Sequence, residues 1–162
     1  MRKIQNILDK ASASISAIVL GVMMVILFTN IILRYVPNVG GFKWYMEGSQ
    51  YLNVWVMFIV GISISVKGEH LSVNVLLDAL KGRTQVVAFG VVSFFTTLFY
   101  IGLTYGTIQL ASRSKQFIST MQPLKMSYVY WVIPILTMIC AVGVIIEYII
   151  RVQDFVNKKE EK

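Results

Sequence analysis

The chain has 162 residues, of which 56% are hydrophobic and 14% are charged, and its mean hydropathy is +0.69. A water-soluble domain carries about 25% charged residues, so this composition excludes a soluble globular protein and indicates one surrounded mostly by lipid. The formal net charge of +7 does not indicate nucleic acid binding, because the basic residues lie at the ends of apolar stretches and form no patch with interleaved aromatics. We expect them to anchor membrane-spanning helices and to meet anionic membrane lipid.

The cysteine and histidine content argues against redox, metal and haem sites. Cys140 is the only cysteine and lies in an apolar stretch, so no disulfide, CxxC pair or cysteine-based zinc site can form within the chain. His70 is the only histidine and lies beside Glu69 in a charged segment, whereas a transmembrane haem needs imidazoles that face one another. The motifs also contain no paired carboxylates and no nucleophile with a nearby base, so we expect neither a cofactor nor an enzyme.

The first apolar stretch, residues 11–33, has 23 residues without a charge. At roughly 1.5 Å per residue, a helix of this length crosses a hydrocarbon core of about 30 Å. It exceeds the apolar region of about 7 to 15 residues found in a signal peptide, so we predict a retained helix. Apolar residues recur at helical spacing from Ile4 to Ile15, which indicates an interfacial helix that leads into this span.

The second span is predicted over residues 48–66. It follows a turn at residues 36–41, where a proline and two glycines stop any helix. Trp44, Tyr45 and Tyr51 lie at its entrance, which is typical of the aromatic belt that meets lipid headgroups.

An interfacial amphipathic helix is predicted over residues 69–81, between the second and third spans. In a helix, His70, Asn74, Asp78 and Lys81 would form one stripe. Residues 71–77 also alternate partly like a strand, but an unpaired strand at a membrane surface would leave its backbone groups unsatisfied. We therefore expect a helix in the plane of the interface, with an opposite, apolar stripe made of Val73, Leu76, Leu77 and Leu80.

Two further spans are predicted over residues 84–112 and 126–146. The third has 29 residues without a charge, more than a perpendicular helix needs, so it should tilt or project beyond the bilayer. In the fourth, Pro134 removes a backbone donor and should kink the helix. The chain is thus expected to be an all-α integral membrane protein, a single membrane domain with four transmembrane helices.

Small and polar residues inside the spans indicate contacts between helices. Gly102 and Gly106 have the GxxxG spacing, and Gly61 with Ser65 is a similar pair, although such pairs are frequent by chance. No acidic or basic residue lies inside a span, which disfavours a small autonomous transporter. Glu47 and Glu147 would lie at opposite membrane faces as boundary residues. The remaining polar residues in the spans can form interhelical hydrogen bonds, chiefly Asn30, Asn53, Thr96, Thr97, Thr104 and Gln109.

The distribution of basic residues predicts the orientation. If both termini are on one side, that side carries ten of the fifteen Lys and Arg residues. The positive-inside rule assigns the richer side to the cytoplasm, so we expect both termini to be cytoplasmic. The five remaining basic residues, Arg34, Lys43, Arg113, Lys115 and Lys125, would then face the outside.

A series of residues through the first two connections carries a family resemblance. It consists of Leu33-Arg34-Tyr35, Trp44, Glu47, Tyr51, Trp55, Phe58, Gly61, Gly68-Glu69-His70-Leu71 and Val73, and a second part has Pro123, Tyr128, Tyr130 and Pro134. In this order, the chain resembles the small membrane subunit of a tripartite ATP-independent periplasmic (TRAP) transporter over nearly its whole length. It departs from the pattern where Gly48 follows Glu47, because many relatives carry a second acidic residue there.

The resemblance implies a location, a role and partners. The chain would lie in the bacterial inner membrane and pack against a large multispanning subunit, which contains the substrate and sodium sites and moves as an elevator. A periplasmic substrate-binding protein would dock across both subunits, for uptake of an organic acid such as sialic acid or a C4-dicarboxylate. Arg34 is the first docking candidate, with an anchor at the headgroups as the equal alternative. All the docking candidates are Arg34, Lys43, Glu47, Arg113, Lys115 and Lys125.

Two other readings stay open at this point. A membrane anchor subunit of a respiratory enzyme would share the four-helix plan, but it should bind haem or quinone, and no histidine lies within a span. A self-sufficient small transporter would move substrate into liposomes that contain this chain alone. A Soret absorbance of the purified protein would favour the respiratory anchor subunit. Flux into such liposomes would favour the self-sufficient transporter.

Overall fold

The computed structural model describes residues 2–36, 40–68, 83–122 and 124–160. Each of its four long helices is long and apolar enough to cross a membrane, which confirms the predicted all-α fold with four transmembrane helices. The interfacial helix predicted over residues 69–81, with Val73, Leu76, Leu77 and Leu80 on its apolar side, lies outside the described residues. The long helices are α1 (Arg2–Tyr35), α2 (Tyr45–Lys67), α4 (Arg83–Arg113) and α5 (Met126–Glu160).

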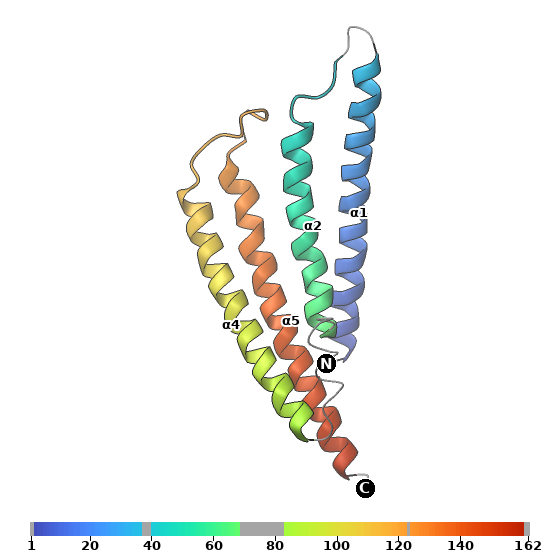
Figure 1. Ribbon diagram of the computed structural model, residues 1–162, viewed down its shortest axis with the longest axis vertical. Helices are drawn as coiled ribbons and strands as arrows, with labels where there is room; N and C mark the ends of the chain where they lie inside the picture. The colour runs from blue at the N-terminus through green and yellow to red at the C-terminus, as the bar shows by residue number, and fades with distance from the viewer. Residues whose placement is uncertain (1, 37–39, 69–82, 123, 161–162) are drawn as a thin grey trace.

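The described helices form a single layer and not a closed bundle. α1 packs along α2, α2 packs along α5, and α5 packs along α4, so the order across the layer is α1, α2, α5, α4 (Figure 1). α1 touches α5 only briefly, and the described parts of α1 and α4 lie at opposite edges without contact. Both chain termini lie toward the same end of the layer (Figure 1), as an even number of crossings requires. We call this the terminal end, and the other the loop end.

Two of the four long helices, α1 and α5, extend well beyond the charge-free stretches that predicted them. α1 begins at Arg2, so the segment expected to lie in the interface continues directly into the first span. α5 continues past residue 146 to Glu160 and contains Pro134 within one continuous helix. α4 closely matches its predicted span. Charged and polar residues in the added turns therefore lie on rigid helices at the terminal end, where they can contact one another.

Two glycines determine where α2 ends and how the connection before it folds. Gly68 follows α2 with a left-handed φ of 63°, and its N–H donates to the Ile64 carbonyl, a common role for glycine after a helix. In the connection before α2, the Phe42 N–H donates to Asn30 Oδ1 over 2.8 Å. A Cβ at Gly41 would overlap that same oxygen. Glycine at this position therefore lets the connection fold back against α1.

Buried side chains pack closely where α2 meets α5. Ile62 and Val66 of α2 and Cys140 of α5 are buried together. A Cβ at Gly143 of α5 would lie only 2.8 Å from Val66 Cγ2. The missing side chain therefore lets the two helices approach closely, as small residues do in membrane helix pairs.

The two small-residue pairs singled out in the sequence differ in their surroundings. A Cβ at Gly61 would lie 3.7 Å from Cys140 Sγ, an ordinary contact, so this pair does face a neighbouring helix. A Cβ at Gly102 or Gly106 would meet no atom within 4 Å. Within the described chain, the GxxxG pair of α4 therefore marks no helix contact.

Hydroxyl groups join α4 to its neighbours inside the membrane. The hydroxyl oxygens of Ser65 and Tyr100 lie 3.1 Å apart, which links α2 to α4. Those of Thr104 and Thr137 lie 2.8 Å apart and link α4 to α5. Lipid offers these groups no hydrogen-bond partner, so they pair with one another. The interhelical role expected for Thr104 is thus confirmed.

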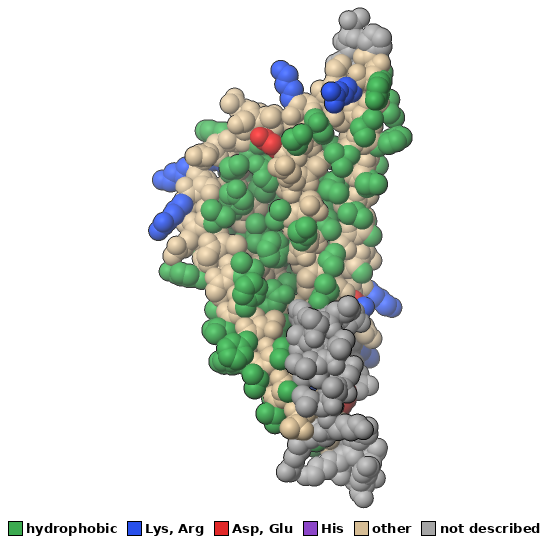
Figure 2. All heavy atoms as spheres, viewed as in Figure 1, with side chains coloured by type: hydrophobic (Ala, Val, Ile, Leu, Met, Phe, Trp, Pro, Cys, Tyr) green, Lys and Arg blue, Asp and Glu red, His purple; other side chains and the backbone are tan. Residues whose placement is uncertain are grey.

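Apolar side chains cover the faces of the layer. Figure 2 shows them as a broad band over the helices, with Lys and Arg side chains toward the ends. The edge helices bury little of their most apolar segments inside the chain, and large side chains such as Phe28 of α1 and Phe99 of α4 are about two-thirds exposed. In the protein, lipid or another subunit must cover these surfaces.

Candidate functional site

The structure places all six docking candidates at the loop end. Arg34 lies at the end of α1, Glu47 in the first turn of α2, and Arg113 at the end of α4. The three lysines lie in or beside the two connections at this end. The five basic side chains are exposed, and Figure 2 shows Lys and Arg side chains projecting there. They therefore offer positive charge to another molecule from across the width of the layer.

Glu47 differs from the basic candidates because it has a partner within the chain. Its Oε2 atom accepts a hydrogen bond from the Thr120 hydroxyl over 2.6 Å, and the Thr120 N–H lies 3.4 Å away. Next to it, Gly48 lies close to Trp44 and Met121, where a Cβ would be 3.1 and 3.2 Å from their side chains. Glu47 therefore ties the start of α2 to the connection between α4 and α5.

That connection is itself folded. The Ile118 N–H donates to the Leu124 carbonyl over 2.9 Å and the Met126 N–H to the Gln116 carbonyl over 3.0 Å. The side chain of Ile118 is almost completely buried. The Lys125 ammonium lies 5.8 Å from the centre of the Phe117 ring, within range of a cation–π contact. The loop end therefore presents its charges from an ordered surface. Sequence reasoning missed Ile118, because a single apolar residue in a polar connection carries no periodic signal.

At the terminal end, Glu147 is the centre of a polar cluster that joins all four helices. It is only 6% exposed. Gln5 of α1 donates to Glu147 Oε2 over 2.7 Å and to the Val66 carbonyl of α2 over 2.6 Å. Arg151 Nε donates to Glu147 Oε1 over 2.9 Å, and its guanidinium carbon lies 4.1 Å from the centre of the Phe89 ring of α4. We call these five residues the Glu147 cluster.

A second charged contact at this end joins α1 to α2. Asp9 Oδ1 lies 3.1 Å from the Lys67 ammonium and accepts a hydrogen bond from the Ser63 hydroxyl. Together with the Glu147 cluster, this contact uses charged residues of three helices to hold the helix ends together.

From the sequence, Glu147 is expected only as a boundary residue, and the cluster around it is not predicted. One signal was present, because Glu147 and Arg151 have the i,i+4 spacing that brings opposite charges together on a helix. Gln5 could not have been found in this way, since it lies 142 positions from Glu147 and is not charged.

The polar contacts at the terminal end hold the helices together, and the exposed basic residues at the loop end present positive charge to another molecule. Among the described residues, no group of three or more His, Cys, Asp or Glu side chains could hold a metal ion. At the terminal end, Asp9 and Glu147 are each paired with a basic side chain. One end of the layer therefore uses charge within the chain, and the other offers it outward.

Comparison with known proteins matches residues 23–154 to the family described as tripartite ATP-independent periplasmic transporters, DctQ component. A TRAP transporter small permease protein of Vibrio cholerae, named for C4-dicarboxylates, is 31% identical over 99 residues, which cover 58% of this chain and 42% of the relative. Two proteins of Haemophilus influenzae assigned as TRAP small permeases are 30% identical over 87 residues and 28% over 110. The first match covers 54% of this chain and 53% of the relative. The second covers 68% of this chain and 66% of the relative.

The chain thus spans about half the length of the first two relatives it matches, whereas the family match covers most of its own length. The family is a transporter component in the bacterial inner membrane, which agrees with four apolar helices of spanning length. The chain therefore belongs to the DctQ family, the small permease components of tripartite ATP-independent periplasmic transporters.

Proposed function

We propose that this chain is the non-catalytic scaffold subunit of a TRAP transporter. It packs against a large multispanning membrane subunit and helps to dock a periplasmic substrate-binding protein during sodium-driven uptake of an organic acid. The observation that carries this proposal is the single layer of four helices, which leaves broad apolar faces exposed.

A layer of this kind is poorly suited to conducting a solute through its own body. A transport path needs polar or ionisable groups that line a cavity within the membrane. Here, the paired hydroxyls inside the layer satisfy one another, as Ser65 does with Tyr100 and Thr104 does with Thr137. Glu147 is held by Gln5 and Arg151 at one end. These contacts support a rigid body that widens the stationary part of a larger transporter.

The loop end supports the docking part of the proposal. It carries five exposed basic residues, and its acidic candidate, Glu47, is hydrogen-bonded to Thr120. A positive surface attracts a partner that presents acidic groups and orients it during the encounter. With both termini in the cytoplasm, as the basic residues predict, this end faces the periplasm.

Arg34 remains our first docking candidate within this surface. It lies at the end of α1, and the connection that follows is fixed to α1 by the hydrogen bond between Phe42 and Asn30. A charge on such a support has a defined position, which favours recognition. Its alternative role is to anchor α1 at the lipid headgroups. Uptake and assembly of the Arg34→Glu variant distinguish the two roles.

The transported compound is expected to be an organic acid, either sialic acid or a C4-dicarboxylate. The Vibrio cholerae relative is named for C4-dicarboxylates. Under this proposal the substrate contacts lie in the other two components, so residues of this chain do not select between the two acids.

The test is to purify the tagged chain from native membranes in mild detergent and to identify the proteins that accompany it by mass spectrometry. We expect a much larger multispanning membrane protein in a fixed ratio to the chain. Recovery of respiratory enzyme subunits would contradict the proposal and favour a membrane anchor. Recovery of the chain alone, together with substrate flux in liposomes that contain only this chain, would favour a self-sufficient transporter.

A further inference from the structure

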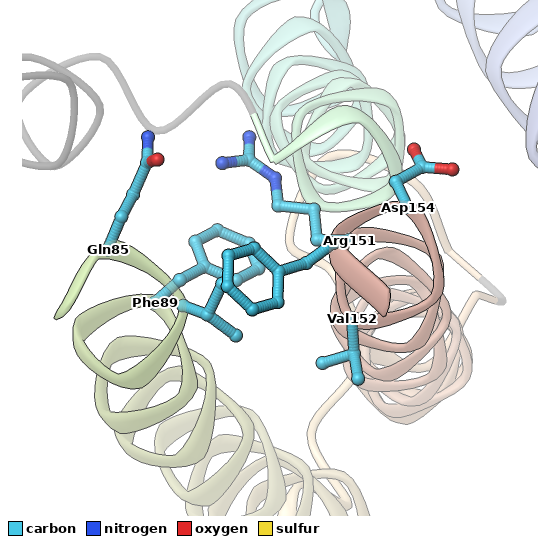
Figure 3. Close-up of a pocket in the computed structure, with 7 residues that line it drawn as sticks. Gln85, Phe89, Arg151, Val152 and Asp154 are labelled. Atoms are coloured by element: carbon cyan, nitrogen blue, oxygen red, sulfur yellow. The ribbon is translucent and has the colours of Figure 1, made fainter. Parts of the chain in front are cut away.

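A pocket of about 330 Å³ lies between α4 and α5 at the terminal end. Its size falls at the lower limit of small-molecule sites, which occupy about 300 to 1,000 Å³, so it suits a headgroup better than a whole lipid. Figure 3 shows its lining residues, including Gln85 and Phe89 from the first two turns of α4 and Arg151 and Val152 from α5. Polar and apolar groups therefore meet in one pocket where two helices end.

Arg151 and Asp154 are the charged residues that line the pocket, and the position of Arg151 is fixed from two sides. Glu147 accepts from its Nε atom, and the Phe89 ring lies against its guanidinium group. The hydrogen bond to Glu147 uses the Nε atom, and the side chain is 34% exposed. An arginine held in this way presents a planar pair of donors, the geometry that binds phosphate oxygens in a bidentate manner.

Gln85 complements this donor. In Figure 3 its amide and the guanidinium group of Arg151 extend toward the same side of the pocket, whereas the carboxylate of Asp154 points away from both. Phe89 and Val152 supply apolar surface beside these polar groups. The pocket therefore combines hydrogen-bond donors with an apolar wall, as a ligand with a polar head and an apolar body requires.

The position of the pocket relative to the membrane indicates the class of ligand. Arg151 lies five positions beyond the apolar stretch that ends at residue 146, and α4 begins at Arg83, two positions before Gln85. These positions correspond to the membrane interface, where lipid phosphates lie and basic residues bind headgroups. We propose that the pocket formed by Gln85, Phe89, Arg151 and Val152 binds the phosphate of a membrane phospholipid headgroup. This inference does not depend on the proposed transport role.

Native mass spectrometry of the full chain in mild detergent tests this site. The probes are phosphatidylglycerol and a diacylglycerol with the same acyl chains but no phosphate. We expect the chain to retain phosphatidylglycerol preferentially. Arg151→Gln should lower its bound fraction about tenfold, since it removes charge-assisted hydrogen bonds. Gln85→Glu should lower it about threefold, because it places a carboxylate beside the phosphate but leaves the contact between Arg151 and Glu147 in place.

Gln153→Glu is the matched control. Gln153 is exposed on α5 near the pocket but does not line it, so the same change in charge should leave phospholipid retention unaltered. Equal losses for Gln85→Glu and Gln153→Glu would overturn the proposal, as would equal retention of the two lipids by the unmodified chain. Displacement of phosphatidylglycerol by millimolar inorganic phosphate would also overturn it and assign the pocket to a soluble anion. Thermal unfolding of Gln85→Glu like that of the control would show that loss of lipid is not loss of fold.

Discussion

The two ends of the helix layer use charged residues in different ways. At the terminal end, Asp9 pairs with Lys67 and the buried Glu147 pairs with Arg151, so charges of one helix bind the next. At the loop end, Arg34 and Arg113 are exposed, and neither forms an ion pair with any described residue. The charges at the terminal end therefore hold the helices together, whereas those at the loop end can contact another molecule.

Buried and exposed charged residues contribute differently to stability. A carboxylate that is removed from water, like Glu147, is tolerated only with hydrogen-bonding and charged partners, and removal of a partner is strongly destabilising. An exposed basic side chain contributes little to stability. Substitutions at the terminal end should therefore change the free energy of unfolding, whereas substitutions at the loop end should change association with partners.

The largest effect is expected for Glu147→Ala. The change removes one of the two acceptors of the Gln5 amide and leaves the partly buried Arg151 without its counter-charge. The free energy of unfolding should fall by about 3 kcal/mol, measured by tryptophan fluorescence during titration of the detergent-solubilised chain with dodecyl sulfate. Glu47→Ala, at the loop end, is the control and should cost about 1 kcal/mol. Equal losses at the two sites would remove the distinction between the ends.

Gly143→Ala should have the next largest effect. The new Cβ would lie 2.8 Å from Val66 Cγ2, so α5 and α2 must separate slightly. Overpacking of this kind costs about 2 kcal/mol. Gly102→Ala is the matched control, because its Cβ would meet no atom within 4 Å and alanine is the better helix former. The same dodecyl sulfate titration compares the two, and an equal loss for Gly102→Ala would show that the described contacts do not account for the effect.

These glycines illustrate which parts of the fold could be predicted from the sequence. The four helices follow from length and composition, because only an apolar stretch of sufficient length can cross lipid. The pairing of the helices does not follow, since the edge helices α1 and α4 are as apolar as the central ones. The GxxxG spacing permits a close approach but does not cause one, so Gly102 and Gly106 remain open while Gly143, which has no such motif, lies against Val66.

The candidate sites show the same limit. The basic residues at the loop end could be placed together from the sequence, because alternate crossings bring the ends of α1 and α4 and the connections to one side. The Glu147 cluster could not, since it depends on helix rotation and on Gln5, a distant neutral residue. The sequence shows the helical spacing of Glu147 and Arg151, but not the burial of Glu147 or the contacts of the pair with α1 and α4.

Thr120→Val should have a smaller effect than Glu147→Ala or Gly143→Ala. It removes the hydroxyl that donates to Glu47 and should lower the free energy of unfolding by about 1 kcal/mol. The expected change is local, so a cysteine placed at Ser119 should react faster with a maleimide in the Thr120→Val chain. Ser119→Ala alone is the control for stability, since this residue is exposed. Unchanged cysteine reactivity would show that Glu47 does not order the connection.

Arg34→Glu should have the smallest effect on stability, within about 0.5 kcal/mol, because the side chain is exposed. If the loop end docks the periplasmic protein, substrate uptake should still fall about tenfold, since a carboxylate would face the partner's acidic groups. Arg34→Lys keeps the charge and should retain most of the uptake. Co-purification of the large subunit should be equal for both variants. Normal uptake by Arg34→Glu would remove Arg34 from the docking surface. Impaired assembly would instead assign it to anchoring α1 at the headgroups. The outcome therefore decides whether charge at the loop end serves recognition of a partner or the position of α1 in the membrane.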